Sequence, residues 1–197
     1  YKNVISNGLV LDKNGVKMSK RLGNVINPFE CIAQYGTDAV RWYMITNSSP
    51  WDNLSVDPDG VKEITSSFFI KLYQAYSFFT LYANVDGFCY EEEDVPYAER
   101  PDFDRWLLSE LNTLVKNVDA SMNDYEPTPA GRLIQNFVID KLSNWYIRLN
   151  KKRFWGGGMT KDKLSAYQTL YKCLDTLSRI IAPVSPFYAD RLFLDLN

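Results

Sequence analysis

Apolar residues at helical spacing constrain the fold of this chain more than any other feature. Between Asp57-Pro58 and Asp86-Gly87 they recur at steps of three and four, which places them on one face of a helix. Similar patterns cover residues 103–122, 133–149 and 164–181, and Ser185-Pro186 opens a last, truncated helix. In the third helix, capped by Thr128-Pro129, the predicted inward side chains are Leu133, Phe137, Val138, Leu142, Trp145, Tyr146 and Leu149. Four or five amphipathic helices with short loops predict a helical bundle over residues 51–197.

Residues 1–50 have a different pattern. Residues 1–26 predict a small β-hairpin that turns at Asp12-Lys13-Asn14-Gly15. A short helix follows from Pro28 to Tyr35, with Asn27 as its N-cap, and ends at Gly36. A second helix then runs from Thr37 to about Asn47. We therefore predict a mainly α protein in which a hairpin-and-helix segment, residues 1–50, precedes the bundle.

The predicted hairpin and the first helix are joined by a basic stretch, Lys17-Met18-Ser19-Lys20-Arg21-Leu22-Gly23-Asn24. Gly-Asn is a turn pair that tolerates positive φ. A compact positive loop on a rigid base suits a polyphosphate whose charge moves during a reaction, because a lysine can follow that charge as a point cation. The alternative is a solvated hairpin with ordinary surface lysines.

Charge is separated along the chain, although the net charge is only −2. Residues 86–104 hold eight acidic residues and one basic residue, whereas residues 141–163 hold seven basic residues and one acidic residue. In the second stretch, Arg148 to Trp155 combines cations with aromatic side chains beside three glycines. This combination is typical of a surface that follows phosphates and stacks bases. The alternative is a solvated helix C-terminus, where the helix dipole favours cations.

Several classes of site are excluded or disfavoured. The chain has no histidine and three scattered cysteines, which excludes a Cys/His zinc cluster and imidazole catalysis. The odd, scattered cysteine count fits a reducing cytoplasm. The acidic run Glu91–Asp94 is interpreted as solvated, so no metal site is assigned. No apolar run approaches 18 residues, so no membrane contact is expected.

The basic loop resembles the second signature of the class I aminoacyl-tRNA synthetases, Lys-Met-Ser-Lys-Ser, with Arg21 where the commonest form has serine. The resemblance implies that Lys17, Met18, Ser19, Lys20 and Arg21 bind ATP, supplied with Mg²⁺. It also implies that Lys20 is catalytic and stabilises the leaving pyrophosphate. Residues 1–50 would then be the end of the catalytic domain, the stem-contact region.

The helical part resembles the anticodon-binding domain of isoleucyl-tRNA synthetases, in the stretches Tyr76–Phe88 and Asp140–Trp155. The resemblance implies tRNA, ATP and isoleucine as partners, and tRNA contacts through a set of five residues. These are Arg148, Lys151, Lys152, Arg153 and Trp155. The valine and leucine enzymes are the nearest alternatives.

The family's first signature, His-Ile-Gly-His, cannot occur without histidine, so the chain resembles a piece of a longer enzyme and is predicted to be inactive alone. Two other functions stay open. One is a non-enzymatic tRNA-binding module that uses the same helical surface. The other is a helical domain whose residues 148–153 contact acidic protein partners.

Overall fold

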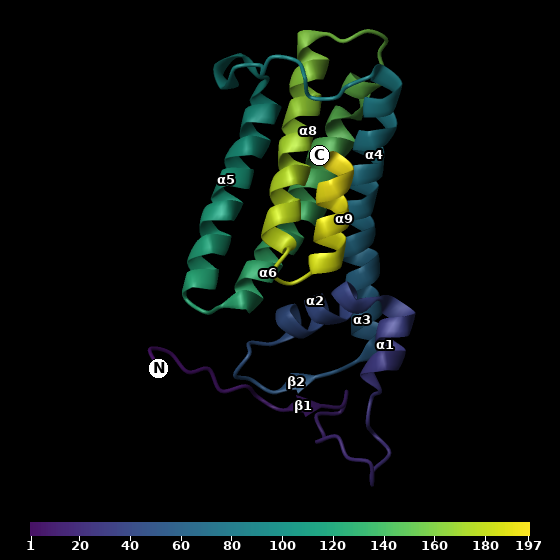
Figure 1. Ribbon diagram of the computed structural model, residues 1–197, viewed down its shortest axis with the longest axis vertical. Helices are drawn as coiled ribbons and strands as arrows, with labels where there is room; N and C mark the ends of the chain where they lie inside the picture. Colours follow the sequence, from purple (N-terminus) through teal and green to yellow (C-terminus); the bar gives the residue numbers. More distant parts are fainter.

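The computed structural model describes all 197 residues and confirms the mainly α prediction (Figure 1). Its two short strands are β1, Val10–Leu11, and β2, Leu54–Ser55. The helices are α1 Pro28–Tyr35, α2 Thr37–Asn47, α3 Pro58–Ile64, α4 Ile70–Asp86, α5 Asp102–Asn123, α6 Pro127–Asn136, α7 Arg148–Asn150, α8 Lys161–Ile181 and α9 Pro186–Leu196. None of these helices is both long and apolar enough to cross a lipid bilayer.

Two of the predicted long helices are continuous rods that contain wider turns. A π-helical segment, Thr65–Phe69, joins α3 to α4, and a longer one, Phe137–Ile147, joins α6 to α7. The second rod then ends in a 3₁₀ turn, Lys151–Phe154, just before the three glycines. In Figure 1 the strands and the N-terminus lie at one end of an elongated molecule, and the loops before α5 and before α8 lie at the other.

Two residues that the sequence predicted to be buried in the core, Trp145 and Leu149, are exposed because of the wide turns. Trp145 is 56% exposed and Leu149 is 62% exposed, whereas Tyr146 is fully buried. The predicted stripe assumed 3.6 residues per turn, but i→i+5 hydrogen bonding puts more than four residues in each turn. Val138, Leu142 and Tyr146, spaced by four, therefore face inward, and Trp145 rotates outward.

The N-terminal hairpin is only partly present. The turn is confirmed, because the Gly15 amide donates to the Asp12 carbonyl at 2.9 Å and Gly15 has a φ of 75°. Beyond it, a single antiparallel bridge joins Leu11 to Lys17. Strand β1 instead pairs in parallel with β2, a partner more than forty residues away that local turn signals could not reveal. Gly8 allows this approach, since a Cβ there would lie 2.0 Å from the Asp52 carbonyl oxygen.

The predicted helix boundaries near the basic loop are confirmed. The side chain of Asn27 accepts the Phe29 amide at 3.0 Å and donates to the Glu30 carboxylate at 2.9 Å. Gly36, with a φ of 85°, separates α1 from α2. The third long helix starts at Pro127, earlier than predicted. Its expected cap, Thr128, is buried and donates its hydroxyl to the carbonyls that end α2.

One hydrophobic core runs through the bundle and includes side chains of α2. The Trp42 ring of α2 stacks on Phe68 with 4.3 Å between centroids. Gly131 of α6 lies so close to α2 that a Cβ would come within 2.6 Å of the Thr46 methyl. The helix that follows the basic loop is thus packed rigidly against the bundle, and this packing fixes the base of that loop.

Candidate functional site

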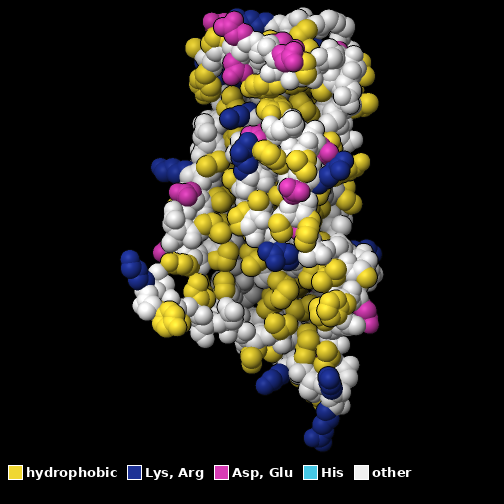
Figure 2. Space-filling model, viewed as in Figure 1, with side chains coloured by type: hydrophobic (Ala, Val, Ile, Leu, Met, Phe, Trp, Pro, Cys, Tyr) yellow, Lys and Arg dark blue, Asp and Glu magenta, His cyan; other side chains and the backbone are white.

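The five residues of the basic motif, 17–21, lie on a short loop at the N-terminal end of the molecule. Lys17, Lys20 and Arg21 are exposed, and Met18 and Ser19 are half-buried. None of the three cations forms an ion pair within the protein. Figure 2 shows Lys and Arg side chains at the lower tip of the molecule. The loop therefore presents unneutralised positive charge to solvent, which attracts a polyanion.

A carboxylate and an amide hold the base of this loop. Asn24 donates its side-chain N–H to Asp12 at 2.8 Å, and its side-chain oxygen accepts the Ser19 amide at 2.9 Å. The other oxygen of Asp12 accepts the amides of Asn14 and Val16, at 2.9 and 2.8 Å. The hydrogen bond from Asn24, followed by that from Val16, lowers the pKa of Asp12 below its ordinary value. We call this pair the Asp12–Asn24 clip.

Sequence reasoning used Asp12 only as a turn residue and missed its link to Asn24. The available signal was weak: an Asx-type turn at Asp12 and an asparagine directly after Gly23. The clip joins the residues before and after the basic motif, and the three cations of the motif remain unpaired. Such a loop can fold over a phosphate chain without losing its anchor points.

The second predicted group lies at the opposite end of the bundle. Arg148, Lys151, Lys152 and Trp155 are all exposed, and the Lys151 ammonium lies 5.6 Å from the centroid of the Trp155 ring. Among the seven cations of residues 141–163, Lys141 pairs with Glu110 and Lys161 pairs with Glu99, both at the surface. Arg148, Lys151 and Lys152 have no ion-pair partner and remain available to an external anion.

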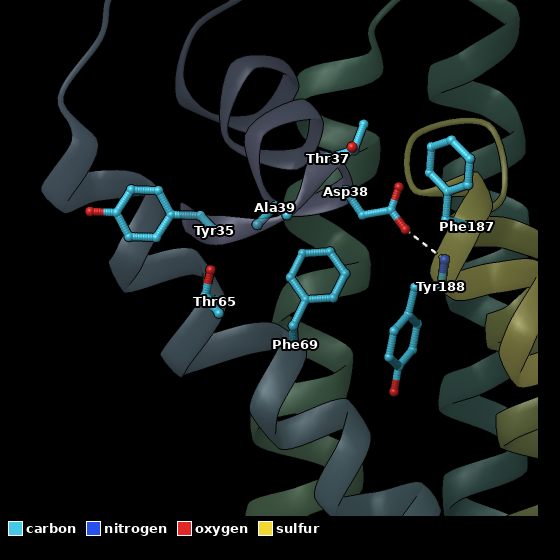
Figure 3. A pocket seen from close by; sticks show the side chains of 9 residues that line it. Tyr35, Thr37, Asp38, Ala39, Thr65, Phe69, Phe187 and Tyr188 are labelled. Carbon is cyan, nitrogen blue, oxygen red and sulfur yellow. Dashed lines mark hydrogen bonds between the residues drawn. The ribbon is translucent and has the colours of Figure 1, made fainter. Parts of the chain in front are cut away.

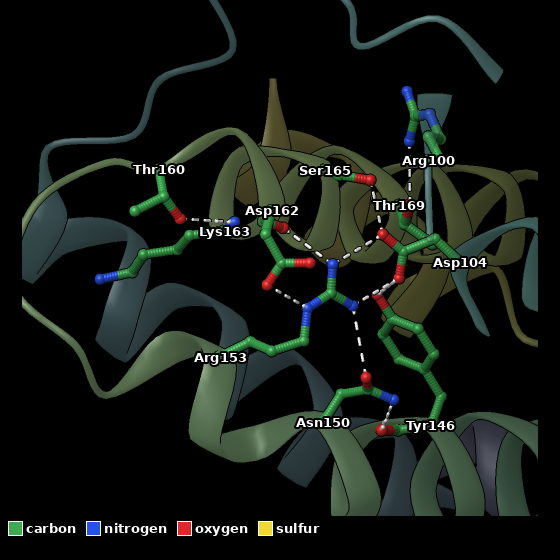
Figure 4. A network of polar contacts seen from close by, with 10 residues as sticks. All are labelled: Arg100, Asp104, Tyr146, Asn150, Arg153, Thr160, Asp162, Lys163, Ser165 and Thr169. Carbon is green, nitrogen blue, oxygen red and sulfur yellow. Dashed lines mark hydrogen bonds and ion pairs between the residues drawn. The ribbon is translucent and has the colours of Figure 1, made fainter. Parts of the chain in front are cut away.

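Arg153 differs from its neighbours because its guanidinium turns inward (Figure 4). It donates to both oxygens of buried Asp104, at 2.6 and 2.9 Å, and its Nε donates to Asp162 at 2.9 Å. The Asp104 carboxylate also accepts the hydroxyls of Tyr146 and Ser165, at 2.7 and 2.5 Å. Arg153 is therefore not on the exposed surface where sequence reasoning placed it.

The phenol of Tyr146 is part of the same network. Burial, and next the negative charge of Asp104, raise the pKa of Tyr146 well above its ordinary value. The phenol thus stays protonated and remains a hydrogen-bond donor at neutral pH. The network joins the start of α5, the long third helix and the start of α8.

Lys163 is a second inward cation that sequence reasoning missed. It is 3% exposed, and its ammonium contacts Asp86 at 2.5 Å and the Gly156 carbonyl at 2.6 Å. Burial alone would raise the pKa of Asp86, but hydrogen bonds from Lys163 and Tyr167 lower it. The first glycine of the triplet is thereby held in place. Arg153 and Lys163 together anchor the segment that carries Trp155.

A pocket lies where the first turn of α2 meets the first turn of α9 (Figure 3). The Asp38 carboxylate accepts the Tyr188 amide at 2.6 Å and so caps α9 across 150 residues of sequence. Arg41, one turn further along α2, donates to the carbonyls of Val184 and Pro183, at 2.8 and 3.2 Å. These contacts tie the segment after the basic loop to the last helix. The structure holds no cluster of three or more carboxylate or thiol groups arranged for a metal.

Family comparisons match both parts of the chain. Residues 1–57 match the family model of tRNA synthetases class I (I, L, M and V). Residues 104–196 match the model of the anticodon-binding domain of tRNA ligase. The basic loop thus lies within the first match, and all five residues of the predicted tRNA surface lie within the second.

Curated relatives align over the whole chain. The isoleucine–tRNA ligase of Bacteroides fragilis is 69% identical over 196 residues, and that of Porphyromonas gingivalis is 65% identical over 197 residues. Each alignment covers 100% of this chain but only 17% of the relative. The chain therefore spans about one-sixth of the length of these relatives.

Solved structures share the fold. The methionyl-tRNA synthetase of Mycobacterium tuberculosis bound by methionyl-adenylate aligns with a TM-score of 0.76 at 20% identity, over 95% of this chain and 36% of that one. A LeuRS–tRNA–LeuAMS ternary complex from Agrobacterium radiobacter K84 aligns with a TM-score of 0.67 at 22% identity, over 95% of this chain and 22% of that one.

Proposed function

Because this chain belongs to the class I aminoacyl-tRNA synthetases, we propose that it is the phosphate-binding and anticodon-arm-binding part of an isoleucine–tRNA ligase. The complete ligase activates isoleucine with ATP and then transfers it to its tRNA. This segment supplies the loop that meets the phosphates and the helical surface that meets the tRNA. The division falls near residue 50, between the end of the catalytic domain and the bundle. The free cysteines fit a cytoplasmic protein.

In the activation step the isoleucine carboxylate attacks the α-phosphate of ATP. The bond from that phosphorus to the bridging oxygen breaks, and the electron pair leaves on pyrophosphate. Charge accumulates on the phosphate oxygens while little covalent work is left to the protein. Lys20, with Lys17 beside it, binds this charge more tightly in the transition state than in the ground state. Arg21 adds a third cation, and Met18 and Ser19 shape the loop around ATP, which arrives with Mg²⁺.

The observation that supports this role is that the cations of the loop are exposed and unpaired. Three exposed cations without ion-pair partners stand on a short segment whose base is fixed by the Asp12–Asn24 clip. A lysine that is already paired would have to break that pair before it could hold a phosphate. Lys20 is free to follow the leaving group.

The helical surface binds tRNA through Arg148, Lys151, Lys152 and Trp155. Arg153 supports this surface from inside, because its guanidinium is fully engaged by Asp104 and Asp162. Each exposed cation that neutralises a phosphate releases counterions, so the complex weakens as salt rises. We assign isoleucine, and not valine or leucine, as the amino acid because the relatives at 65–69% identity are isoleucine–tRNA ligases.

The test of the ATP role is Lys20→Ala in a full-length ligase that contains this segment. Isoleucine-dependent pyrophosphate exchange is expected to fall about 100- to 1000-fold, the usual cost of removing one preorganised transition-state contact. Lys13→Ala is the matched control, because Lys13 is an exposed lysine of the neighbouring turn. Exchange at the unaltered rate after Lys20→Ala would refute the assignment. Exchange catalysed by the 197-residue chain alone would instead contradict the proposal that this chain is an inactive part of a longer ligase.

A further inference from the structure

Trp145 is the exposed end of a row of aromatic rings that starts in the core. The buried Tyr146 ring is stacked on Phe103 with 5.9 Å between centroids, and Phe103 lies 5.2 Å from Trp106. Trp106 in turn lies 6.2 Å from Trp145. Tyr146 is itself fixed by its hydrogen bond to Asp104. Trp145 is therefore supported from beneath by rings that cannot easily move.

The surface around Trp145 carries charges of both signs, and Arg148 is the unpaired cation next to it along the helix. Lys141, one turn before it, has its ammonium 5.6 Å from the Trp106 ring and 3.5 Å from the Glu110 carboxylate. Arg148, three residues after Trp145, is exposed and has no ion-pair partner. Asp140 is exposed on the same helix. Beyond Arg148 the free charges on this helix, Lys151 and Lys152, are all positive.

We propose that Trp145 is a stacking platform for an unpaired nucleobase of the tRNA, with Arg148 and Lys152 contacting the adjacent phosphates. The proposal rests on the tRNA-binding role given above and adds a residue to that surface. A half-exposed indole loses little conformational entropy when it stacks, because its inner neighbours already fix it. An exposed aromatic face followed along the same helix by unpaired cations favours a polyanion with flat rings over an apolar protein segment.

Trp145 differs from the other exposed tryptophan of this surface. Trp155 precedes Gly156–Gly158, and its ring lies against the flexible Lys151 side chain. Trp145 stands on the rod itself, ten residues earlier, with Trp106 behind it. The π-helical segment is what turns it outward. Trp145 therefore has an aromatic ring behind it, whereas the Trp155 ring lies against a lysine side chain.

The test measures binding of a fluorescein-labelled RNA hairpin, carrying the anticodon stem and loop of an isoleucine tRNA, to the 197-residue chain by fluorescence anisotropy. Trp145→Ala is expected to weaken binding about 5- to 150-fold, the range for loss of one base–aromatic stack. Trp145→Phe keeps an aromatic face and is expected to retain most of the affinity. Trp51→Ala is the matched control, because Trp51 is 46% exposed but belongs to the turn before β2.

The outcomes separate this proposal from the proposed function. If Trp145→Ala binds the hairpin as well as the unaltered chain, while Lys151→Glu with Lys152→Glu binds less, the stacking role is wrong and the tRNA surface stands. If the unaltered chain does not bind the hairpin even at low salt, the stacking role and the tRNA-binding role both fail. If Trp145→Ala leaves RNA binding intact and instead abolishes self-association of the chain, the face is a protein contact and the stacking role is again wrong. Circular dichroism confirms that each variant is folded.

Discussion

Both carboxylate oxygens of Asp104 accept hydrogen bonds from the guanidinium of Arg153, at 2.6 and 2.9 Å, although 49 residues separate the two. Asp104 is completely buried and the Arg153 side chain is 14% exposed. A buried ion pair of this kind contributes little net stability compared with a well-packed apolar pair, yet removing one partner is costly. The remaining charge then stays buried without compensation.

We therefore expect Arg153→Ala to lower the free energy of unfolding by about 3–5 kcal/mol. Lys152→Ala, one position earlier and exposed, is expected to change it by less than about 0.5 kcal/mol. Urea titration followed by circular dichroism measures both. Equal effects of the two substitutions would contradict the internal role of Arg153.

The contact between Asp38 and Tyr188 makes a second stability prediction. Asp38→Ala removes the side-chain cap of α9 and is expected to destabilise the chain by about 0.5–2 kcal/mol. Asp52→Ala serves as the control, because Asp52 is exposed and its carboxylate forms no ion pair. Hydrogen exchange adds a local readout. In Asp38→Ala the amides of α9 should exchange faster, whereas those in the middle of α5 should not.

The Asp12–Asn24 clip should respond to acid. Because the pKa of Asp12 is below its ordinary value of 3.8, the clip's contribution is complete above that value and is lost as the pH falls through the lowered pKa. Amide exchange at Asn14 and Val16 should therefore keep its protection between pH 8 and pH 5, after correction for the intrinsic rate. Protection that disappears near neutral pH would argue against an ionised Asp12 in the clip. Asn24→Ala is expected to reduce that protection at every pH.

The salt dependence of RNA affinity tests the exposed cations of the helical surface. If Arg148, Lys151 and Lys152 each neutralise one phosphate, every contact contributes about 0.7 to the slope of log affinity against log salt for single-stranded RNA. Replacing Lys151 and Lys152 by alanine should reduce the slope by about 1.4 in magnitude. Lys172→Ala on α8 is the control. An unchanged slope would remove these two lysines from the tRNA surface.

Local sequence signals predicted most of the secondary structure because the determinants are local. Asn27, Gly36 and Gly87 each mark a helix end, and the structure places an end at each of them. The pairing of β1 with β2 could not be predicted, since its register depends on contacts between distant residues.

In the predicted site, too, features set by local sequence could be predicted and features set by long-range contacts could not. Exposure of Lys20 and Lys152 follows from their positions in a loop and on an outer helix face. The inward turn of Arg153 could not be foreseen, because Asp104, its partner, reaches it only after α5 packs against the third helix. The exposure of Trp145 was missed for another reason: its helix does not keep the 3.6-residue period.

The π-helical segment Phe137–Ile147 has a consequence for every residue after it. Its turns hold more than four residues, whereas those of a regular α-helix hold 3.6. The same 11 residues wound as a regular α-helix would thus turn Arg148 and Lys152 to a different face, with no change in net charge. The side from which these positive groups project is therefore set by the winding of the segment that precedes them.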